Sequence, residues 1–190
     1  MTFHFSETEL AGIVLIEPRV YPDDRGFFTE IYKRSEFAAN GISELFLQVN
    51  CTRSSKGVLR GLHYQKAPKA QAKLIRCIGG EIFDVVVDIR PASPTYGRWL
   101  GIMLSANRHD TLYVPTGFAH GFCVTGESAE IMYMTSEEYA PAYEGGVIWN
   151  DPDLAIHWPV AEPQLSPRDQ NWPRLCDAEN NLRYSGEVDD

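Results

Sequence analysis

The stretch AKLIRCIGGEIFDVVVDI, residues 72–89, contains two apolar runs that a Gly-Gly pair separates. Short runs rich in β-branched side chains, bounded by glycines, are typical of strands. In the second run the side chains alternate between two faces, and Asp84 shares a face with Ile82. Gly79-Gly80 is the two-residue signal of a β-hairpin, so we expect the two runs to pair as neighbouring strands.

The same pattern continues on both sides of this stretch. Short β-like runs lie between turn signals about every 8–12 residues, which is typical of a sandwich or a barrel. The other runs are residues 12–21, 26–32, 45–52, 57–65, 99–105, 111–115, 121–126 and 130–136. The sequence therefore predicts one mostly antiparallel β domain over residues 1–190, with its core at about residues 10–160.

Two short helices interrupt the predicted strands. Residues 34–41 form the first, with Ser35 as the N-cap and Gly41 at the end. From Asp151 onward the sequence is richer in Pro, Asp and Trp, which favours irregular structure. Ser166-Pro167 is a helix start within an irregular or helical tail at residues 161–190, because serine caps and proline suits the first helical position.

The charge of the chain restricts its partners. With 17 Lys and Arg against 26 Asp and Glu, the formal net charge is −9, which argues against binding nucleic acid or an anionic membrane surface. A local cluster of basic residues can still bind an anionic small ligand. No apolar run reaches the ~18 residues of a membrane span, and no basic segment followed by an apolar one begins the chain.

The four cysteines are far apart and include no CxxC pair. A disulfide framework and a zinc site are therefore both poor interpretations of them. We expect reduced thiols and a cytoplasmic protein.

Two histidines lie in apolar runs beside a glycine: His63 in RGLHYQ and His120 in PTGFAHG. The second motif has the Pro-x-Gly-x-x-His spacing of the second cupin motif, and cupins often hold a metal with three histidines and a carboxylate. The first half of such a site needs a histidine two residues after His63, where this chain has Gln65. Lys73 would also add an ammonium, so we expect no metal. Packing in the core stays open for both histidines.

Acid–base chemistry is the second possibility for His63. An unperturbed histidine has a pKa near ~6.5 and can accept a proton at neutral pH. A tyrosine, with a pKa near ~10, can return a proton from the opposite side of a flat intermediate. Tyr133 lies in the strand-like run EIMYMTS, where the residues alone favour a core tyrosine with a satisfied hydroxyl.

Several motifs, taken together, resemble the dTDP-4-dehydrorhamnose 3,5-epimerase family. They occur in the family's order over nearly the whole chain, and the full set of motifs is more specific than any single motif. The motifs are DDRGFFTEIY (23–32), RGLHYQ (60–65), KLIRCIGGEIFDVVVDIR (73–90), PTGFAHGF (115–122), YMTSEEYAPAYEGGVIWNDPDLAIHWP (133–159) and LSPRD (165–169). The resemblance implies a cupin-like double-stranded β-helix (jelly roll) with a few short helices, a homodimer with exchanged strands, and no required cofactor.

The resemblance also implies roles for individual residues. His63 matches the general base, Tyr133 the general acid, and Asp169 the carboxylate that orients the histidine. Residues around the sugar and its keto oxygen are Arg60, Lys73 and His120. Nucleotide and diphosphate contacts are Arg25, Glu30, Gln48, Asn50 and Arg168, with Tyr139 stacking on the thymine and Glu144 as a further binding residue. From the residues alone, a helix N-terminus is the favoured role of Asp169, and Asp84 is its rival as the histidine's partner.

The implied activity inverts C3 and C5 of dTDP-4-dehydro-6-deoxy-glucose through an enolate. A relative that acts at one carbon, or on another nucleotide sugar, is the nearest alternative. A metal-dependent cupin and a non-catalytic sugar-binding cupin are the alternatives from other classes.

The spacing of Arg60 and His63 makes a geometric prediction. Three positions apart, they point to opposite faces of a regular strand. Both can face one pocket only if the strand is distorted, and Gly61 is the natural place for a bulge. We therefore expect an irregular ladder at residues 60–62.

Overall fold

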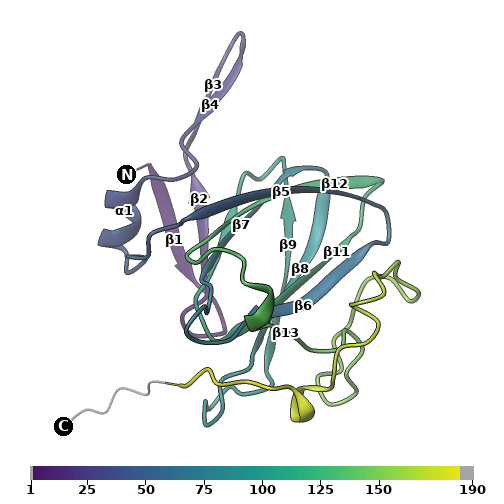
Figure 1. Ribbon diagram of the computed structural model, residues 1–190. Coiled ribbons are helices and arrows are strands. Elements are labelled where there is room, and N and C mark those ends of the chain that lie inside the picture. The colour runs from purple at the N-terminus through teal and green to yellow at the C-terminus, as the bar shows by residue number, and fades with distance from the viewer. Residues whose placement is uncertain (1, 185–190) are drawn as a thin grey trace, which may run out of the picture.

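A computed structural model describes residues 2–184, which form two antiparallel β-sheets that face each other (Figure 1). The first sheet has six strands in the order β1-β2-β10-β7-β12-β5. Their bounds are β1 Phe3–Glu7, β2 Val14–Pro18, β10 Thr111–Val114, β7 Lys73–Gly79, β12 Ser128–Thr135 and β5 Gln48–Ser55. The second sheet has five strands, in the order β13-β6-β11-β8-β9. Their bounds are β13 Glu144–Gly146, β6 Leu59–Gln65, β11 Phe118–Val124, β8 Glu81–Asp88 and β9 Trp99–Ser105.

The predicted hairpin at Gly79-Gly80 is wrong, although both of its strands exist. Strand β7 pairs with β10 and β12 in the first sheet, whereas β8 pairs with β9 and β11 in the second. The Gly pair is a corner at which the chain changes sheets. Gly80 has a φ of +72°, and a Cβ there would collide with the backbone of Ser128. Glycine is needed at this corner because only glycine tolerates both the angle and the contact.

The first predicted helix is present with a different start. Helix α1 spans Arg34–Ala39, and its N-cap is Lys33, without a side-chain cap. The predicted cap at Ser35 is wrong because Ser35 already lies in the first turn. Gly41, with a φ of +85°, follows the helix end as predicted.

The helix predicted from Ser166 is also wrong. The chain forms a single turn there, in which Ser166 Oγ accepts the Asp169 N–H at 3.1 Å and Ser166 O accepts the Gln170 N–H at 3.2 Å. Pro173 follows closely, and it can neither donate to a helix nor leave the residue before it helical. A short 3₁₀ helix, η2, comes later at Leu175–Asp177, and another, η1, spans Pro141–Tyr143.

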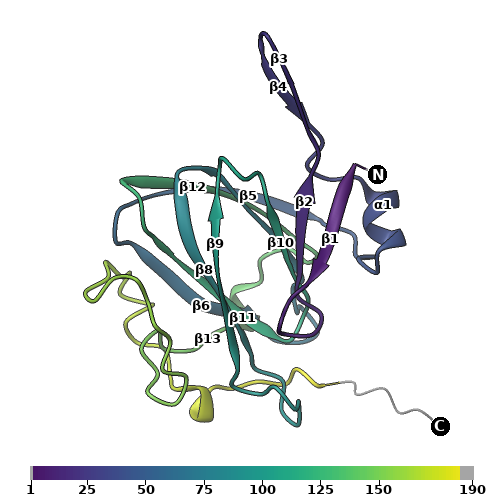
Figure 2. The same ribbon diagram turned by 180° about the vertical axis from the view of Figure 1, so that it is seen from behind.

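Both faces of β8 are buried, which explains its nearly continuous apolar sequence. Ile82 and Val86 pack between the two sheets, with residues such as Leu104 and Ile131. The opposite face, with Val85 and Val87, is covered by side chains of the C-terminal segment, including Leu154, Leu175 and Leu182. Figure 2 shows this segment running along the outside of the second sheet. A third cluster packs Phe37 of α1 against Phe3 of β1.

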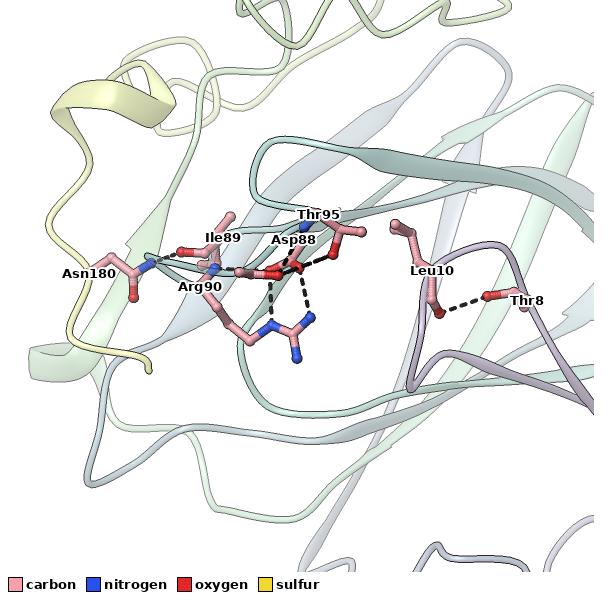
Figure 3. A network of polar contacts seen from close by, with 8 residues as sticks. Thr8, Leu10, Asp88, Ile89, Arg90, Thr95 and Asn180 are labelled. Atoms are coloured by element: carbon pink, nitrogen blue, oxygen red, sulfur yellow. Dashed lines mark hydrogen bonds and ion pairs between the residues drawn. The ribbon is translucent and has the colours of Figure 1, made fainter. Parts of the chain in front are cut away.

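A polar network at the end of β8 ties the C-terminal segment to the sheet (Figure 3). Asp88 is fully buried and accepts hydrogen bonds from Arg90 at 2.7 and 2.9 Å, and from Ser93 and Thr95 at 2.6 Å. Burial opposes ionisation, but these donors hold the pKa of Asp88 below its ordinary value. The Asn180 side chain donates to Ile89 O beside this network.

A two-stranded arm extends away from the sheets (Figures 1 and 2). Its strands are β3 (Val20–Asp23) and β4 (Gly26–Thr29), joined by the predicted turn. Phe27 and Phe28 on the arm are 59% and 64% exposed, although the Phe27 ring packs on His109 with centroids 4.7 Å apart. Isolated apolar residues on a surface are ordinary, but an extended arm that presents two phenylalanines has the character of an interaction element.

Candidate active site

The predicted irregularity in β6 is confirmed. His63 lies opposite His120 on β11, whereas Arg60 lies opposite Phe122, so three steps on β6 correspond to two on β11. Gly61 sits at this bulge with a φ of +128°, and a Cβ there would lie 2.5 Å from Gly121 Cα. As a result, Arg60 and His63 both line the same cavity.

This cavity, of about 500 Å³, opens between the two sheets. It brings together residues from five strands, β5, β6, β7, β11 and β12, and from the C-terminal segment. Among its lining residues are Arg60 and His63 of β6, Lys73 of β7, His120 of β11, Tyr133 of β12, and Asp169. All three residues predicted to be catalytic, and the three predicted to surround the sugar, therefore lie around one space. We call it the central cavity.

His63 Nε2 lies 2.5 Å from Asp169 Oδ1. The Asp169 side chain is only 3% exposed. Burial opposes its ionisation, but hydrogen bonds with His63, Ser166 and Trp172 hold the pKa of Asp169 below its ordinary value. The pair is therefore a carboxylate placed to stabilise an imidazolium. Asp169 binds His63 from the turn that Ser166 caps. It is therefore both the partner of the histidine and part of a capped turn.

Asp84, the rival partner, belongs to a second pair. Its Oδ2 lies 2.8 Å from His120 Nε2, and its side chain is fully buried on β8. Oδ1 of Asp84 is buried without a hydrogen-bond partner among the described residues. Sequence reasoning placed Asp84 on the correct face but not with this histidine. The signal was the carboxylate in an inward-facing position of a buried strand.

Lys73 lines the central cavity together with both histidines. Burial lowers the pKa of Lys73 to about 8, against the opposing charges of Asp84 and Glu144. Burial also raises the pKa of Tyr133, while Arg60 partly counters that shift. The phenol therefore carries its proton at neutral pH. Arg60 Nε donates to Ser54 Oγ at 3.0 Å, which holds the guanidinium toward the cavity.

An adjoining cavity of about 400 Å³ shares His63, Lys73 and Tyr133 with the central one. It contains the other predicted binding residues of this region: Gln48, Asn50, Tyr139, Glu144 and Arg168. These side chains contact one another, since Glu144 accepts from the Tyr139 hydroxyl at 2.9 Å and from Arg168 at 2.7 Å. Gln48 donates to Asn50 and accepts the Tyr139 N–H, both at 2.8 Å.

Two predicted binding residues do not join this group. Arg25 lies at the turn of the arm, where its side chain is 89% exposed and pairs with Asp23 at 2.6 Å. Glu30 follows the arm, and neither residue lines the two cavities. Within a single chain, then, the predicted site is incomplete at these two positions.

Sequence reasoning missed Trp172, which donates to Asp169 and belongs to none of the motifs. Ser166 was predicted only as a cap, and it accepts the Asp169 N–H. No group of three His, Cys, Asp or Glu residues with metal-binding geometry occurs within residues 2–184. The helices found there are also too short or too polar to span a membrane.

The family model for dTDP-4-dehydrorhamnose 3,5-epimerase matches residues 7–177. The chain belongs to this family. It is 48% identical to the dTDP-4-dehydrorhamnose 3,5-epimerase of Shigella flexneri, over 91% of this chain and 96% of that protein. The Escherichia coli enzyme is also 48% identical, over 86% of this chain and 89% of its own length.

Solved structures agree with this assignment. The Legionella pneumophila epimerase, in complex with dTDP-4-keto-L-rhamnose, has a TM-score of 0.93 and 41% identity, and covers 97% of this chain and 100% of that one. A 3'-monoepimerase from Streptomyces bikiniensis, in complex with dTDP-quinovose, has a TM-score of 0.84 and 38% identity, over 89% and 86% of the chains. As a dTDP-4-dehydrorhamnose 3,5-epimerase family member, the protein is an isomerase, and the predicted cupin-like jelly roll is confirmed.

Proposed function

We propose that the protein inverts C3 and C5 of dTDP-4-dehydro-6-deoxy-glucose, giving dTDP-4-dehydro-L-rhamnose without a cofactor. One observation carries this proposal: the His63–Asp169 pair and the protonated Tyr133 line the same cavity from different elements. A base and an acid around one space are what inversion of a carbon requires, because the proton leaves one face and returns to the other.

His63 removes the proton. The C4 ketone acidifies the hydrogens on C3 and C5, since the carbanion left behind is an enolate. Asp169, held ionised by its donors, stabilises the imidazolium that forms at His63 and fixes the orientation of its ring. General-base catalysis of this kind contributes about 10²–10⁴-fold to the rate.

Cations stabilise the enolate oxygen. Arg60 and Lys73 both line the central cavity, and His120 lines it with its carboxylate partner Asp84 behind it. In a buried site these charges act at low dielectric and need no reorganisation as the oxyanion develops. With a pKa near 8, Lys73 is still mostly protonated at neutral pH.

Tyr133 returns the proton to the opposite face. Its raised pKa keeps the phenol neutral and able to donate. Repetition at the second carbon uses the same pair after the ring adjusts. The dTDP group extends into the adjoining cavity, where Tyr139 offers a half-exposed ring to the thymine and Arg168 a charge to the diphosphate.

We further propose a homodimer in which the arm of one copy completes the site of the other. The exposed Phe27 and Phe28 support this, because more than half of each side chain stays accessible although Phe27 contacts His109. The separation of Arg25 and Glu30 from both cavities supports it as well. The edge strand β5 also carries an exposed Val49, which extends the apolar surface available to a second copy.

The four cysteines have no disulfide between them and Cys77 and Cys123 are buried. Reduced thiols suit a reducing compartment, so we propose a cytoplasmic location. Recovery of the protein from membranes or from an oxidising compartment, after fractionation of the source cells, would contradict this location.

The test incubates the protein with the 4-keto sugar nucleotide in D₂O and follows C3 and C5 by NMR. Deuterium and inversion at both carbons are the expected result. Change at C3 alone would instead match the activity named for the Streptomyces bikiniensis neighbour. Exchange at neither carbon would refute the proposal.

Two variants make the test specific. His63→Asn removes the base and should lower the exchange rate about 10³-fold. His4→Asn is the matched control, because His4 is an exposed histidine of β1 outside both cavities. Unchanged exchange in His63→Asn would favour a sugar-binding protein without this catalysis. A metal-dependent cupin would be favoured if elemental analysis found a bound metal and chelation of that metal abolished the exchange.

A further inference from the structure

Trp172 lies beside the His63–Asp169 pair, on the side away from the central cavity. Its indole packs flat on the backbone of β13, because a Cβ added to Gly146 would overlap three of the indole ring atoms. Gly146 is the register partner of His63 in the ladder between β13 and β6. The indole is thus seated directly across from the base, on a position that only glycine leaves open.

The indole also contacts both members of the pair. Trp172 Nε1 donates to Asp169 Oδ1 at 3.3 Å, and this is the same oxygen that lies 2.5 Å from His63 Nε2. The rings of Trp172 and His63 meet edge to face, with centroids 6.1 Å apart. Because a 3.3 Å hydrogen bond is long, we expect the packing of the ring to contribute more than its N–H.

Trp172 touches no space that the substrate would occupy. It lines neither the central nor the adjoining cavity. It borders instead a separate cavity of about 190 Å³, together with Gly145, Gly146 and Pro173. Neither His63 nor Asp169 lines that space, so the indole forms part of the wall that separates the buried carboxylate from it.

We propose that Trp172 is a positioning residue for the proton acceptor: it holds Asp169 against His63 and keeps water from the carboxylate. This inference rests on the proposed function, because it concerns how the base is oriented. A residue that orients the base without touching the substrate changes the rate of the chemical step but not the binding of substrate.

The first test compares alanine variants of two tryptophans. Trp172→Ala should lower kcat about tenfold and leave KM unchanged, because a displaced base reacts slowly in a site that still binds. Trp158→Ala is the matched control. Trp158 also belongs to the C-terminal segment, donates through Nε1 to Trp149 O at 2.8 Å, and packs on the second sheet, but it contacts neither His63 nor Asp169. The Trp158→Ala variant should lose thermal stability and keep its kcat. The same pattern in Trp172→Ala would overturn the proposal.

A second test uses Gly146. In the natural background, Gly146→Ala should push the indole off the strand and lower kcat by a factor similar to that of Trp172→Ala. In the Trp172→Ala background the added methyl finds space, so Gly146→Ala should cost little more. Additive losses in this cycle would overturn the proposal, because they would mean that Gly146 acts independently of the indole.

A third measurement does not depend on turnover. In ¹⁵N-histidine-labelled protein, the deshielded proton of the short His63–Asp169 hydrogen bond should be visible, should shift in Trp172→Ala, and should stay nearly in place in Trp172→Phe, which keeps a ring. An unchanged signal in Trp172→Ala would overturn the proposal. If the natural protein catalyses no exchange, the proposed function fails, while this signal still reports whether Trp172 holds the pair.

Discussion

His120 Nε2 lies 2.8 Å from Asp84 Oδ2, and the two side chains come from adjacent strands of one sheet. Asp84 is fully buried, and it also opposes the effect of burial on the pKa of Lys73. One carboxylate therefore contacts His120 and influences the charge of Lys73, and both of these residues line the central cavity. The groups that face Lys73 from the surrounding elements are Arg60, His63, Asp84, His120, Tyr133 and Glu144.

Asp84→Asn should shift the alkaline limb of the kcat/KM profile to lower pH. Lys73 acts as a cation, so activity falls as pH rises through its pKa of about 8. The Asp84 charge holds that pKa up, and its removal lets burial lower the pKa further. Asp110→Asn is the control, because Asp110 is a buried carboxylate that pairs with Arg108 outside the cavities. A shift to higher pH in Asp84→Asn would contradict this account.

Lys73→Arg should remove the alkaline limb near pH 8, because a guanidinium stays protonated throughout this range. Its kcat should nevertheless fall, since the planar group does not match the geometry of an ammonium. Lys69→Arg serves as the control, since Lys69 pairs with Glu137 outside both cavities. An alkaline limb that persists unchanged in Lys73→Arg would assign the titration to another group.

Tyr133→Phe should suppress inversion more than deuterium exchange, with inversion reduced about 10²-fold. Deprotonation by His63 can proceed without the acid, but delivery to the opposite face cannot. Exchange and inversion are measured by NMR in the same sample. Tyr113→Phe removes a buried hydroxyl that binds Glu44 away from the site, so it should affect stability and spare both rates. Equal loss of exchange and inversion in Tyr133→Phe would mean that Tyr133 is not the sole donor.

Gly61→Ala should lower the free energy of unfolding by about 3 kcal/mol and also reduce kcat/KM. An alanine would be strained at a φ of +128°, and its Cβ would press on Gly121. Relief of this strain would straighten β6 and turn Arg60 from the cavity. Denaturant titration measures the stability. Gly126→Ala, at a glycine with open space and no positive φ, should change it by no more than a few tenths of a kcal/mol.

Replacement of Phe27 and Phe28 by serine should convert the proposed dimer to monomers and abolish most activity, because Arg25 and Glu30 would no longer reach a second site. Light scattering after gel filtration gives the mass. Tyr96→Ser, at another exposed aromatic residue, is the control.

Mixing of two inactive variants tests the exchange of arms directly. In a dimer of Arg25→Ala with His63→Asn, one of the two sites combines an intact body with an intact arm. Random mixing should thus restore about a quarter of the natural activity. Recovery of none would show that Arg25 acts within its own chain.

Local pattern was sufficient to predict most of the strands, whereas the residues of the site came from the resemblance to the family. The alternation in residues 81–89 placed Asp84 on the same face as Ile82, and the odd spacing of Arg60 and His63 required a bulge at Gly61. The resemblance to the family identified residues that do meet in two adjoining cavities, from His63 to Asp169. These predictions succeeded because side-chain periodicity and motif spacing are properties of the chain itself.

The sequence alone did not predict which distant segments contact one another. Gly79-Gly80 reads as a hairpin, yet whether two strands pair depends on which other edges compete for them, and β7 and β8 each find both neighbours elsewhere. The resemblance matched Asp169 to His63, with Asp84 as its rival from the residues alone, and the folded chain pairs Asp169 with His63 and Asp84 with His120. Trp172 had no motif at all. Sequence determines which face a residue occupies, whereas contact between distant segments is decided when the two sheets and the C-terminal segment pack together.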